Sequence, residues 1–203
     1  MGIYKKHILP RLLNSAMGSA EIEKLRPWVI DLASGVVLEI GIGAGHNLPF
    51  YKSISKLYAL EPSKEMISMA KKRAESLSFP MEFLNASAEH IPLFDSSVDT
   101  VISTWTLCSI EKPEEALKET ARVLRPNGHF IFIDHGISPN PLMRALQNIL
   151  TPFTKYFTGN CHLNRDIEKI IRSAGFNIQR LSQFHEKNKP LMYNYKGIGI
   201  VSK

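Results

Sequence analysis

The residues whose spacing points most directly to chemistry are three glycines that follow a short apolar run. Val36 to Ile40 reads VVLEI, which has the composition of a buried strand, and Gly41, Gly43 and Gly45 come directly after it. Glycines allow a tight turn from a strand into a helix, which this pattern predicts to begin near His46. In a parallel sheet, such a loop presents backbone N–H groups at the carboxyl edge of the first strand, where ligands bind.

The spacing of the glycines discriminates among nucleotide ligands. A dinucleotide-binding fingerprint has a glycine at the sixth position of G-x-G-x-x-G, and that position counted from Gly41 is His46. The sequence also has no G-x-x-x-x-G-K-[ST] loop for a nucleoside triphosphate. A pyrophosphate ligand is therefore disfavoured. Glu61, at the end of the second predicted strand, is suited to accept the hydrogens of two ribose hydroxyls.

Strands and helices alternate along the chain, as is typical of a doubly wound α/β sheet. Strands are predicted at 36–40, 57–60, 81–85, 98–103 and 129–134, and helices at 65–74, capped by Ser63, and at 114–124. A long amphipathic helix at 141–157 is expected to kink or divide at Pro152, and a helix at 165–174 is expected to be capped by Asn164. Two final strands are predicted at 176–184 and 195–202, joined by a charged turn at 186–190.

The glycine loop belongs to a longer pattern with a fixed order. E-x-G-x-G-x-G at 39–45, Glu61, and L-R-P-x-G at 124–128 occur at intervals that resemble the class I S-adenosylmethionine-dependent methyltransferases, in the family with methyltransferase type 11 domains. The resemblance extends over residues 38–135, about half of the chain. It implies a Rossmann-like sheet of about seven strands with a terminal antiparallel hairpin, and S-adenosylmethionine as the cofactor.

The resemblance also implies roles for single residues. An acidic residue before the loop orders it and holds the cationic end of the cofactor, and the residue after the second strand holds the ribose. The family reads adenine with a D-A-x-x-L-P segment, and here serine stands at the aspartate position, so this contact departs from the family pattern. The predicted cofactor contacts are Glu39, Gly41, Gly43, Gly45, Glu61, Pro62, Met66, Ser87, Ala88, Glu89, Thr104 and Leu107.

Three shorter segments bear on the molecule that would accept the methyl group. TLCS at 106–109, DH at 134–135 and GNCHLNRD at 159–166 are similar to segments of small membrane-associated methyltransferase-like proteins of animals that methylate alkyl thiols. The expected reaction is methyl transfer to a small apolar molecule such as a thiol, lipid or quinone. A non-catalytic S-adenosylmethionine-binding module is an alternative, and an NAD-dependent oxidoreductase a less favoured one. His135 is the candidate base for an acceptor that must lose a proton, ahead of His46 and His162.

One domain is expected to hold all 203 residues. Within it, residues 1–33 are predicted to form a helical cap at the ligand edge or one flank of the sheet, and residues 136–175 a helical insertion that covers the substrate. The N-terminal segment mixes apolar residues with Lys5, Lys6 and Arg11, which suits contact with a membrane surface. No apolar stretch reaches the length of about 20 residues that spans a bilayer, and a cytoplasmic location is expected.

Charge and cysteine content bear on nucleic-acid binding, disulfide bonds and metal sites. The net charge is +6, but the basic residues are scattered and no nucleic-acid-binding motif is visible, so no nucleic-acid partner is predicted. Cys108 and Cys161 lie far apart without C-x-x-C spacing. The sequence therefore suggests neither a disulfide framework nor a metal site, and each cysteine is read as a buried apolar residue.

Overall fold

A seven-stranded sheet forms the centre of the computed structural model, which describes residues 4–186 and 189–201. The strand order is β3-β2-β1-β4-β5-β7-β6. The first five strands pair in parallel, and β7 pairs antiparallel with both β5 and β6, which confirms the predicted Rossmann-like sheet with a terminal hairpin. The strands are β1 (Val36–Ile40), β2 (Lys56–Leu60), β3 (Met81–Leu84), β4 (Val98–Thr104), β5 (Leu124–Gly136), β6 (Phe176–Glu186) and β7 (Lys189–Val201).

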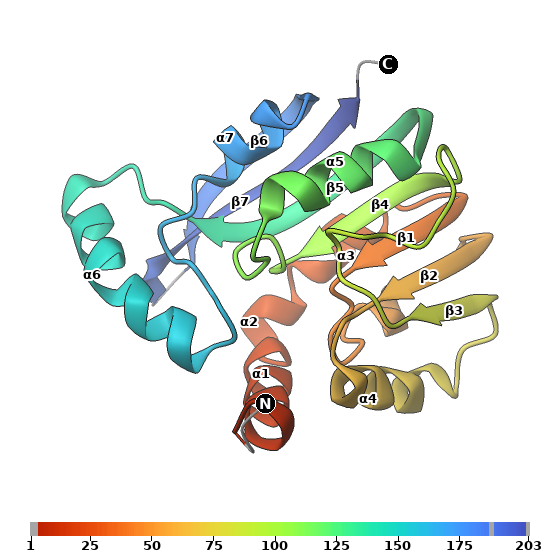
Figure 1. Ribbon diagram of the computed structural model, residues 1–203, viewed down its shortest axis with the longest axis horizontal. Coiled ribbons are helices and arrows are strands. Elements are labelled where there is room, and N and C mark those ends of the chain that lie inside the picture. Colours follow the sequence, from red (N-terminus) through yellow and green to blue (C-terminus); the bar gives the residue numbers. More distant parts are fainter. Residues whose placement is uncertain (1–3, 187–188, 202–203) are drawn as a thin grey trace.

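Helices cover both faces of the sheet (Figure 1). Residues of α5 and α7 pack on one face, whereas residues of α3, α4 and η2 pack on the other. The helical elements are η1 (Tyr4–Ile8), α1 (Leu9–Met17), α2 (Ala20–Glu23), α3 (Arg26–Ile30), η2 (Leu48–Phe50), α4 (Lys64–Ala74), α5 (Pro113–Val123), α6 (Pro141–Phe157) and α7 (Ile167–Ser173).

The alternation of side chains along the central strands explains the two layers of core. In β5, Phe130 and Phe132 join the core beneath α5 and α7, while Ile131 and Ile133 join the core beneath α3. All four are essentially buried, and each such side chain stabilises the fold by about 1.5–3 kcal/mol through burial. A strand that is apolar on both faces must be covered on both, which favours the three-layer arrangement.

The carboxyl edge of the sheet is flanked by the two segments predicted to lie near the ligand. Figure 1 shows that the arrowheads of the parallel strands point toward the side of the molecule where α1 and α6 lie. In open α/β sheets, ligands bind at this edge, outside the carboxyl ends of the strands.

One element differs from the sequence prediction close to this edge. The helix expected near His46 is wrong, because residues 44–47 form turns and only the short 3-10 helix η2 follows them. The side chains of His46, Asn47 and Tyr51 instead reach Asn14 and Glu39, which holds this segment against the start of the sheet.

Two further differences lie in the second half of the chain. Asp166, not Asn164, caps α7, since its carboxylate accepts a hydrogen bond from Lys169 N at 3.0 Å. The long helix α6 is a single element despite Pro152. Residues 1–3, 187–188 and 202–203, which include parts of the predicted N-terminal helix, charged turn and last strand, lie outside the described residues.

Candidate active site

The glycine loop after β1 has one open position between two packed ones. Gly41, Gly43 and Gly45 all have positive φ angles, of 67°, 57° and 84°. A Cβ atom at Gly41 would collide with the side chain of Thr106, and one at Gly45 would lie 3.1 Å from Ala70. At Gly43 the nearest heavy atom would be 3.9 Å away. The loop therefore leaves room beside Gly43, as a ligand held against its backbone requires.

Glu61 lies at this open side of the loop. Its carboxylate is 9% exposed and accepts hydrogen bonds from Gly43 N at 3.1 Å and Ser63 N at 2.9 Å. Burial raises the pKa of Glu61, although these two backbone hydrogen bonds act in the opposite direction. Each carboxylate oxygen has more than one acceptor direction, so both can also accept hydroxyl groups of a ribose. The loop and Glu61 thus fit a nucleoside.

Glu39 sits beneath the loop in a buried polar network. Its two carboxylate oxygens accept hydrogen bonds from Asn47 Nδ2 at 2.8 Å and from the Tyr51 hydroxyl at 2.7 Å. Asn47 also donates to Thr104 Oγ1 at 2.9 Å and accepts a hydrogen bond of 2.6 Å from Arg26. This network ties the loop to β1, β4 and α3, which supports the predicted ordering role of Glu39.

The charges in this network are modified by burial. Burial raises the pKa of Glu39, and the hydrogen bonds from Tyr51 and Asn47 together with the charge of Arg26 oppose that rise. Burial also lowers the pKa of Arg26 to about 10, which leaves it charged at neutral pH. Arg26, Asn47 and Tyr51 were not predicted as site residues. The signal that could have found them is the rule that a buried carboxylate needs donors nearby.

The residues predicted to surround adenine differ in exposure. Pro62 is exposed, Met66 is half-buried in the first turn of α4, and Ala88 is buried. Ser87 donates to the carboxylate of Glu89, so these two predicted adenine contacts are paired with each other. Asn85, which was not predicted, donates to the carbonyl oxygens of Glu61 and Pro62 at 3.1 and 2.9 Å. The adenine contacts stay predictions.

The segment after β4 contributes differently from the prediction. Thr104 is buried and hydrogen-bonded to Asn47, while the side chain of Leu107 is fully buried in the core beneath α5. Thr106 is the residue that contacts the glycine loop, through a 3.5 Å hydrogen bond to the carbonyl of Gly41. The loop between β4 and α5 is therefore anchored to the glycine loop.

Two residues beyond Thr106, this segment meets two others in a buried cluster of Cys108, His135 and Cys161, which we call the cysteine–histidine cluster. Nε2 of His135 lies 3.1 Å from Sγ of Cys161, and one ligating atom from each residue lies within 4.8 Å of the others. Asp134, fully buried, accepts hydrogen bonds from the backbone N–H of Cys108 and His135. Cys108 is buried, as the sequence interpretation expects, whereas Cys161 is partly exposed, and the structure brings the two cysteines together although they lie far apart in the sequence.

The electrostatics of the cluster favour charge separation. The hydrogen bond from Cys161 and the neighbouring His135 hold the pKa of the Cys108 thiol well below its usual range, against the effect of burial. Burial lowers the pKa of His135, but the charge of Cys108, a hydrogen bond to it and the charge of Asp134 together outweigh burial and raise the pKa to about 9. The hydrogen bond to Cys108 raises the pKa of Cys161.

The two other candidate histidines have structural partners. Nε2 of His46 lies 3.0 Å from both the backbone and side-chain oxygens of Asn14, and burial lowers the pKa of His46 to about 4. Arg73 links the same Asn14 to the carbonyl of Ala44, so α1 contacts the glycine loop. Nδ1 of His162 lies 2.7 Å from the carbonyl of Asn160.

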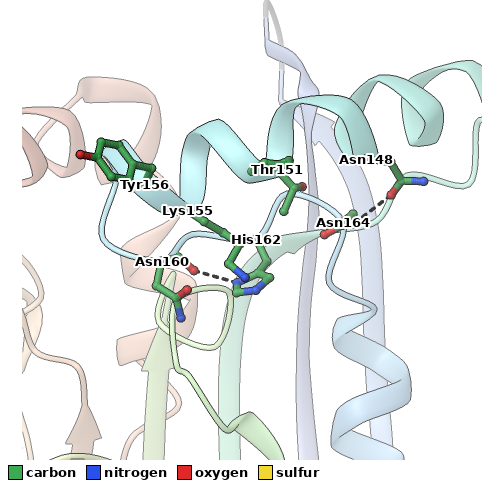
Figure 2. Close-up of a pocket in the computed structure, with 8 residues that line it drawn as sticks. Asn148, Thr151, Lys155, Tyr156, Asn160, His162 and Asn164 are labelled. Atoms are coloured by element: carbon green, nitrogen blue, oxygen red, sulfur yellow. Dashed lines mark hydrogen bonds between the residues drawn. The ribbon is translucent and has the colours of Figure 1, made fainter.

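A cavity of about 680 Å³ lies between α6 and the segment that follows it. Figure 2 shows its lining residues: Asn148, Thr151, Lys155 and Tyr156 come from α6, and Asn160, His162 and Asn164 from the following segment. Asn160 and His162 flank Cys161 in the sequence, so the segment that carries this cysteine also lines the cavity.

Known proteins resemble this chain in both sequence and fold. A sequence model of the methyltransferase domain matches residues 38–132. Thiol S-methyltransferase TMT1B of Rattus norvegicus is 35% identical over 144 residues, which are 69% of this chain and 59% of that protein. Thiol S-methyltransferase TMT1A of Homo sapiens is 30% identical over 168 residues, which are 78% of this chain and 69% of that protein.

The chain thus spans about three fifths of the length of the rat relative and about two thirds of the human one. The crystal structure of the YcgJ protein of Bacillus subtilis has the same fold, with a TM-score of 0.71 at 17% identity over 89% of this chain and 98% of that one. Together with the glycine loop and Glu61, these findings show that the chain belongs to the class I S-adenosylmethionine-dependent methyltransferases.

Proposed function

We propose that the enzyme methylates the sulfur of a small apolar thiol. The observation that carries this proposal is that the segments 106–109, 134–135 and 159–166 meet at the cysteine–histidine cluster, although they are separated by more than twenty residues in the sequence. These are the segments in which the chain is similar to the thiol methyltransferases. Their convergence is expected if they share a role in handling the acceptor.

The residues around the glycine loop are proposed to hold the cofactor. When bound, S-adenosylmethionine supplies an electrophilic methyl group on a sulfonium. Gly43 offers space and Glu61 two oxygens for the ribose hydroxyls, while Glu39 keeps the loop rigid through Asn47 and Tyr51. Ser87, Ala88 and Glu89 are proposed to lie along the adenine. Rigid positioning of reactants contributes on the order of 7–11 kcal/mol to such displacements.

The cluster is proposed to handle the proton of the acceptor thiol. A thiol of pKa about 8.5 is only partly ionised at neutral pH, and the thiolate is the better nucleophile. Nε2 of His135 lies close to Cys161, which is partly exposed, so an acceptor that approaches along Cys161 comes within reach of the imidazole. The role of His135 as a general base stays a prediction. Because the pKa of His135 is raised to about 9, the imidazole can take the proton of the acceptor only after it has passed its own proton to the Cys108 thiolate.

The helical segments beside the site are proposed to admit an apolar acceptor. Leu142, Ile149 and Phe153 on α6 are 72%, 65% and 60% exposed, and Leu12 on α1 is 54% exposed. Residues 1–20 and 135–165 contain no Asp or Glu, so the charged residues that these two segments contribute are all basic. An apolar, basic surface suits an anionic lipid interface.

We propose that α6 roofs the acceptor site and that α1 and α6 contact a membrane peripherally, in a protein located in the cytoplasm. Among the described residues, no helix combines the length and apolar character that crossing a membrane requires.

The direct test is release of S-adenosylhomocysteine across a panel of acceptors. Small alkyl thiols should be methylated faster than lipid extracts, quinones and amines at equal concentration. A matched series of an alkyl thiol and the corresponding alcohol tests the acceptor atom, because the two differ at that atom only. Turnover of a lipid, quinone or amine with no turnover of any thiol would overturn the proposal.

A further inference from the structure

The cysteine–histidine cluster has the composition of a metal site. Cys108 follows β4, His135 lies at the end of β5, and Cys161 follows α6, so three separate elements deliver two thiols and an imidazole to one place. Cys108 is 2% exposed and His135 is 3% exposed. Nδ1 of His135 is buried and has no hydrogen-bond partner among the described residues. The ring is therefore partnered there only through Nε2, which faces the sulfur atom of Cys161.

We propose that Cys108, His135 and Cys161 bind a Zn²⁺ ion. Cysteine thiolates and imidazole are the ligands that zinc prefers, with bonds of about 2.3 Å to sulfur and about 2.0–2.1 Å to nitrogen. In a tetrahedral site these bonds place the ligand atoms about 3.5–3.8 Å apart. The three ligand atoms already lie within 4.8 Å of one another, so small side-chain adjustments close the site.

Hydrogen bonds to the backbone hold each ligand segment in place. Asp134 accepts from the N–H groups of both Cys108 and His135, at 3.3 and 2.8 Å. Arg165 donates to the carbonyl of Ile110 at 2.8 Å, and Thr154 donates to the carbonyl of Cys161 at 2.8 Å. These hydrogen bonds fix the backbone that carries each ligand, so little rearrangement of the chain is needed to bind the ion.

Three protein ligands leave one position of a tetrahedral ion open, as in zinc sites that take part in catalysis. A thiol that enters this position forms a sulfur–metal bond, releases its proton to water and stays available as a nucleophile; no electron is transferred. Cys161 is partly exposed, and its neighbours Asn160 and His162 line the cavity beside α6, so an acceptor can approach from that side. This role rests on the proposed thiol acceptor and takes the place of the general-base role of His135, which then serves as a ligand. Metal binding itself does not rest on the acceptor.

The test uses Co²⁺ as a spectroscopic substitute for zinc in the full chain, purified without a histidine tag, reduced and freed of metal. One Co²⁺ per chain should bind and give a thiolate-to-cobalt charge-transfer band with visible bands of tetrahedral intensity. Cys161→Ser should weaken the band, because one thiolate ligand remains, and should weaken zinc binding by more than about 100-fold, since even surrounding groups contribute 10–100-fold. His129→Gln is the matched control, because His129 lies on the same strand with an exposed side chain.

Wild-type chain with both thiols free and no charge-transfer band would overturn the metal site, and so would a disulfide between the two cysteines that persists under reduction. A band that survives in the double variant Cys108→Ser/Cys161→Ser would also overturn it. Calorimetric binding of S-adenosylmethionine and the acceptor panel are measured on the same samples. Thiol methylation by metal-free protein would leave the proposed function intact and would refute only the coordination of the acceptor thiol by the metal. A cobalt band without turnover of any thiol would refute the proposed thiol acceptor and leave the metal site intact.

Discussion

Replacing Glu61 with alanine should weaken S-adenosylmethionine binding more than any other single substitution at the loop. In the structure its two oxygens already accept hydrogen bonds from Gly43 N and Ser63 N, and the side chain is 9% exposed. Hydrogen bonds that involve a charged group contribute about 1.5–3 kcal/mol in mutational series. Loss of the ribose contacts together with loosening of the loop should therefore raise the Kd about 10- to 150-fold, since 1.4 kcal/mol is tenfold.

Isothermal titration calorimetry with S-adenosylmethionine and S-adenosylhomocysteine measures this change. Glu75→Ala is a suitable control, because Glu75 is exposed at the end of α4 and away from the loop. In the wild type, the affinity for S-adenosylmethionine should fall as the pH is lowered, because the charged form of Glu61 is the better hydrogen-bond acceptor. Since burial raises the pKa of Glu61, this fall should begin at a higher pH than for an ordinary carboxyl group. A folded Glu61→Ala variant with wild-type affinity would refute the placement of the ribose.

Four further predictions address the supports of the site. Gly41→Ala should lower the free energy of unfolding by more than about 1 kcal/mol in chemical denaturation, because φ is 67° and the new Cβ has no room. Asn47→Leu should lower the free energy of unfolding by about 2–5 kcal/mol in the same assay, because Arg26 and Glu39 each lose a hydrogen bond to the amide of Asn47. Burial lowers the pKa of His46 to about 4, so the unfolded chain takes up a proton below its ordinary pKa of 6.5 while the folded chain does not. Stability should therefore fall between about pH 6.5 and 4, and less steeply in His46→Gln; parallel curves would contradict this. Phe153→Glu should reduce cosedimentation with anionic vesicles and leave neutral vesicles unaffected, whereas equal binding by both proteins would exclude α6 from the contact.

Local patterns were sufficient to predict that the glycine loop and Glu61 lie next to each other. The run before Gly41, the glycine spacing and Glu61 at the end of the next strand depend on contacts between sequence neighbours or adjacent parallel strands. The doubly wound sheet follows from the alternation of strands and helices, whereas its terminal hairpin was implied by the resemblance to the class I methyltransferases. The helix predicted near His46 is wrong because local pattern did not decide the structure there. His46 instead contacts Asn14, a residue far away in the sequence.

Parts of the site that combine distant segments were beyond the sequence patterns. Glu39 was identified, but its partners come from three different elements and no spacing connects them. Cys108, His135 and Cys161 each fall in a segment that was singled out, yet their separation indicated independent residues. Only the crossing of the chain from β4 and β5 to the segment after α6 brings the sulfur atoms to the imidazole.

The most direct test of the account follows the methyl group itself. The enzyme is incubated with S-adenosylmethionine carrying an isotope-labelled methyl group and a small alkyl thiol, and the products are identified by mass spectrometry. The account predicts a labelled methyl thioether formed in equal amount with S-adenosylhomocysteine. Label found only on oxygen, nitrogen or carbon acceptors, with the thiol recovered unchanged, would contradict it.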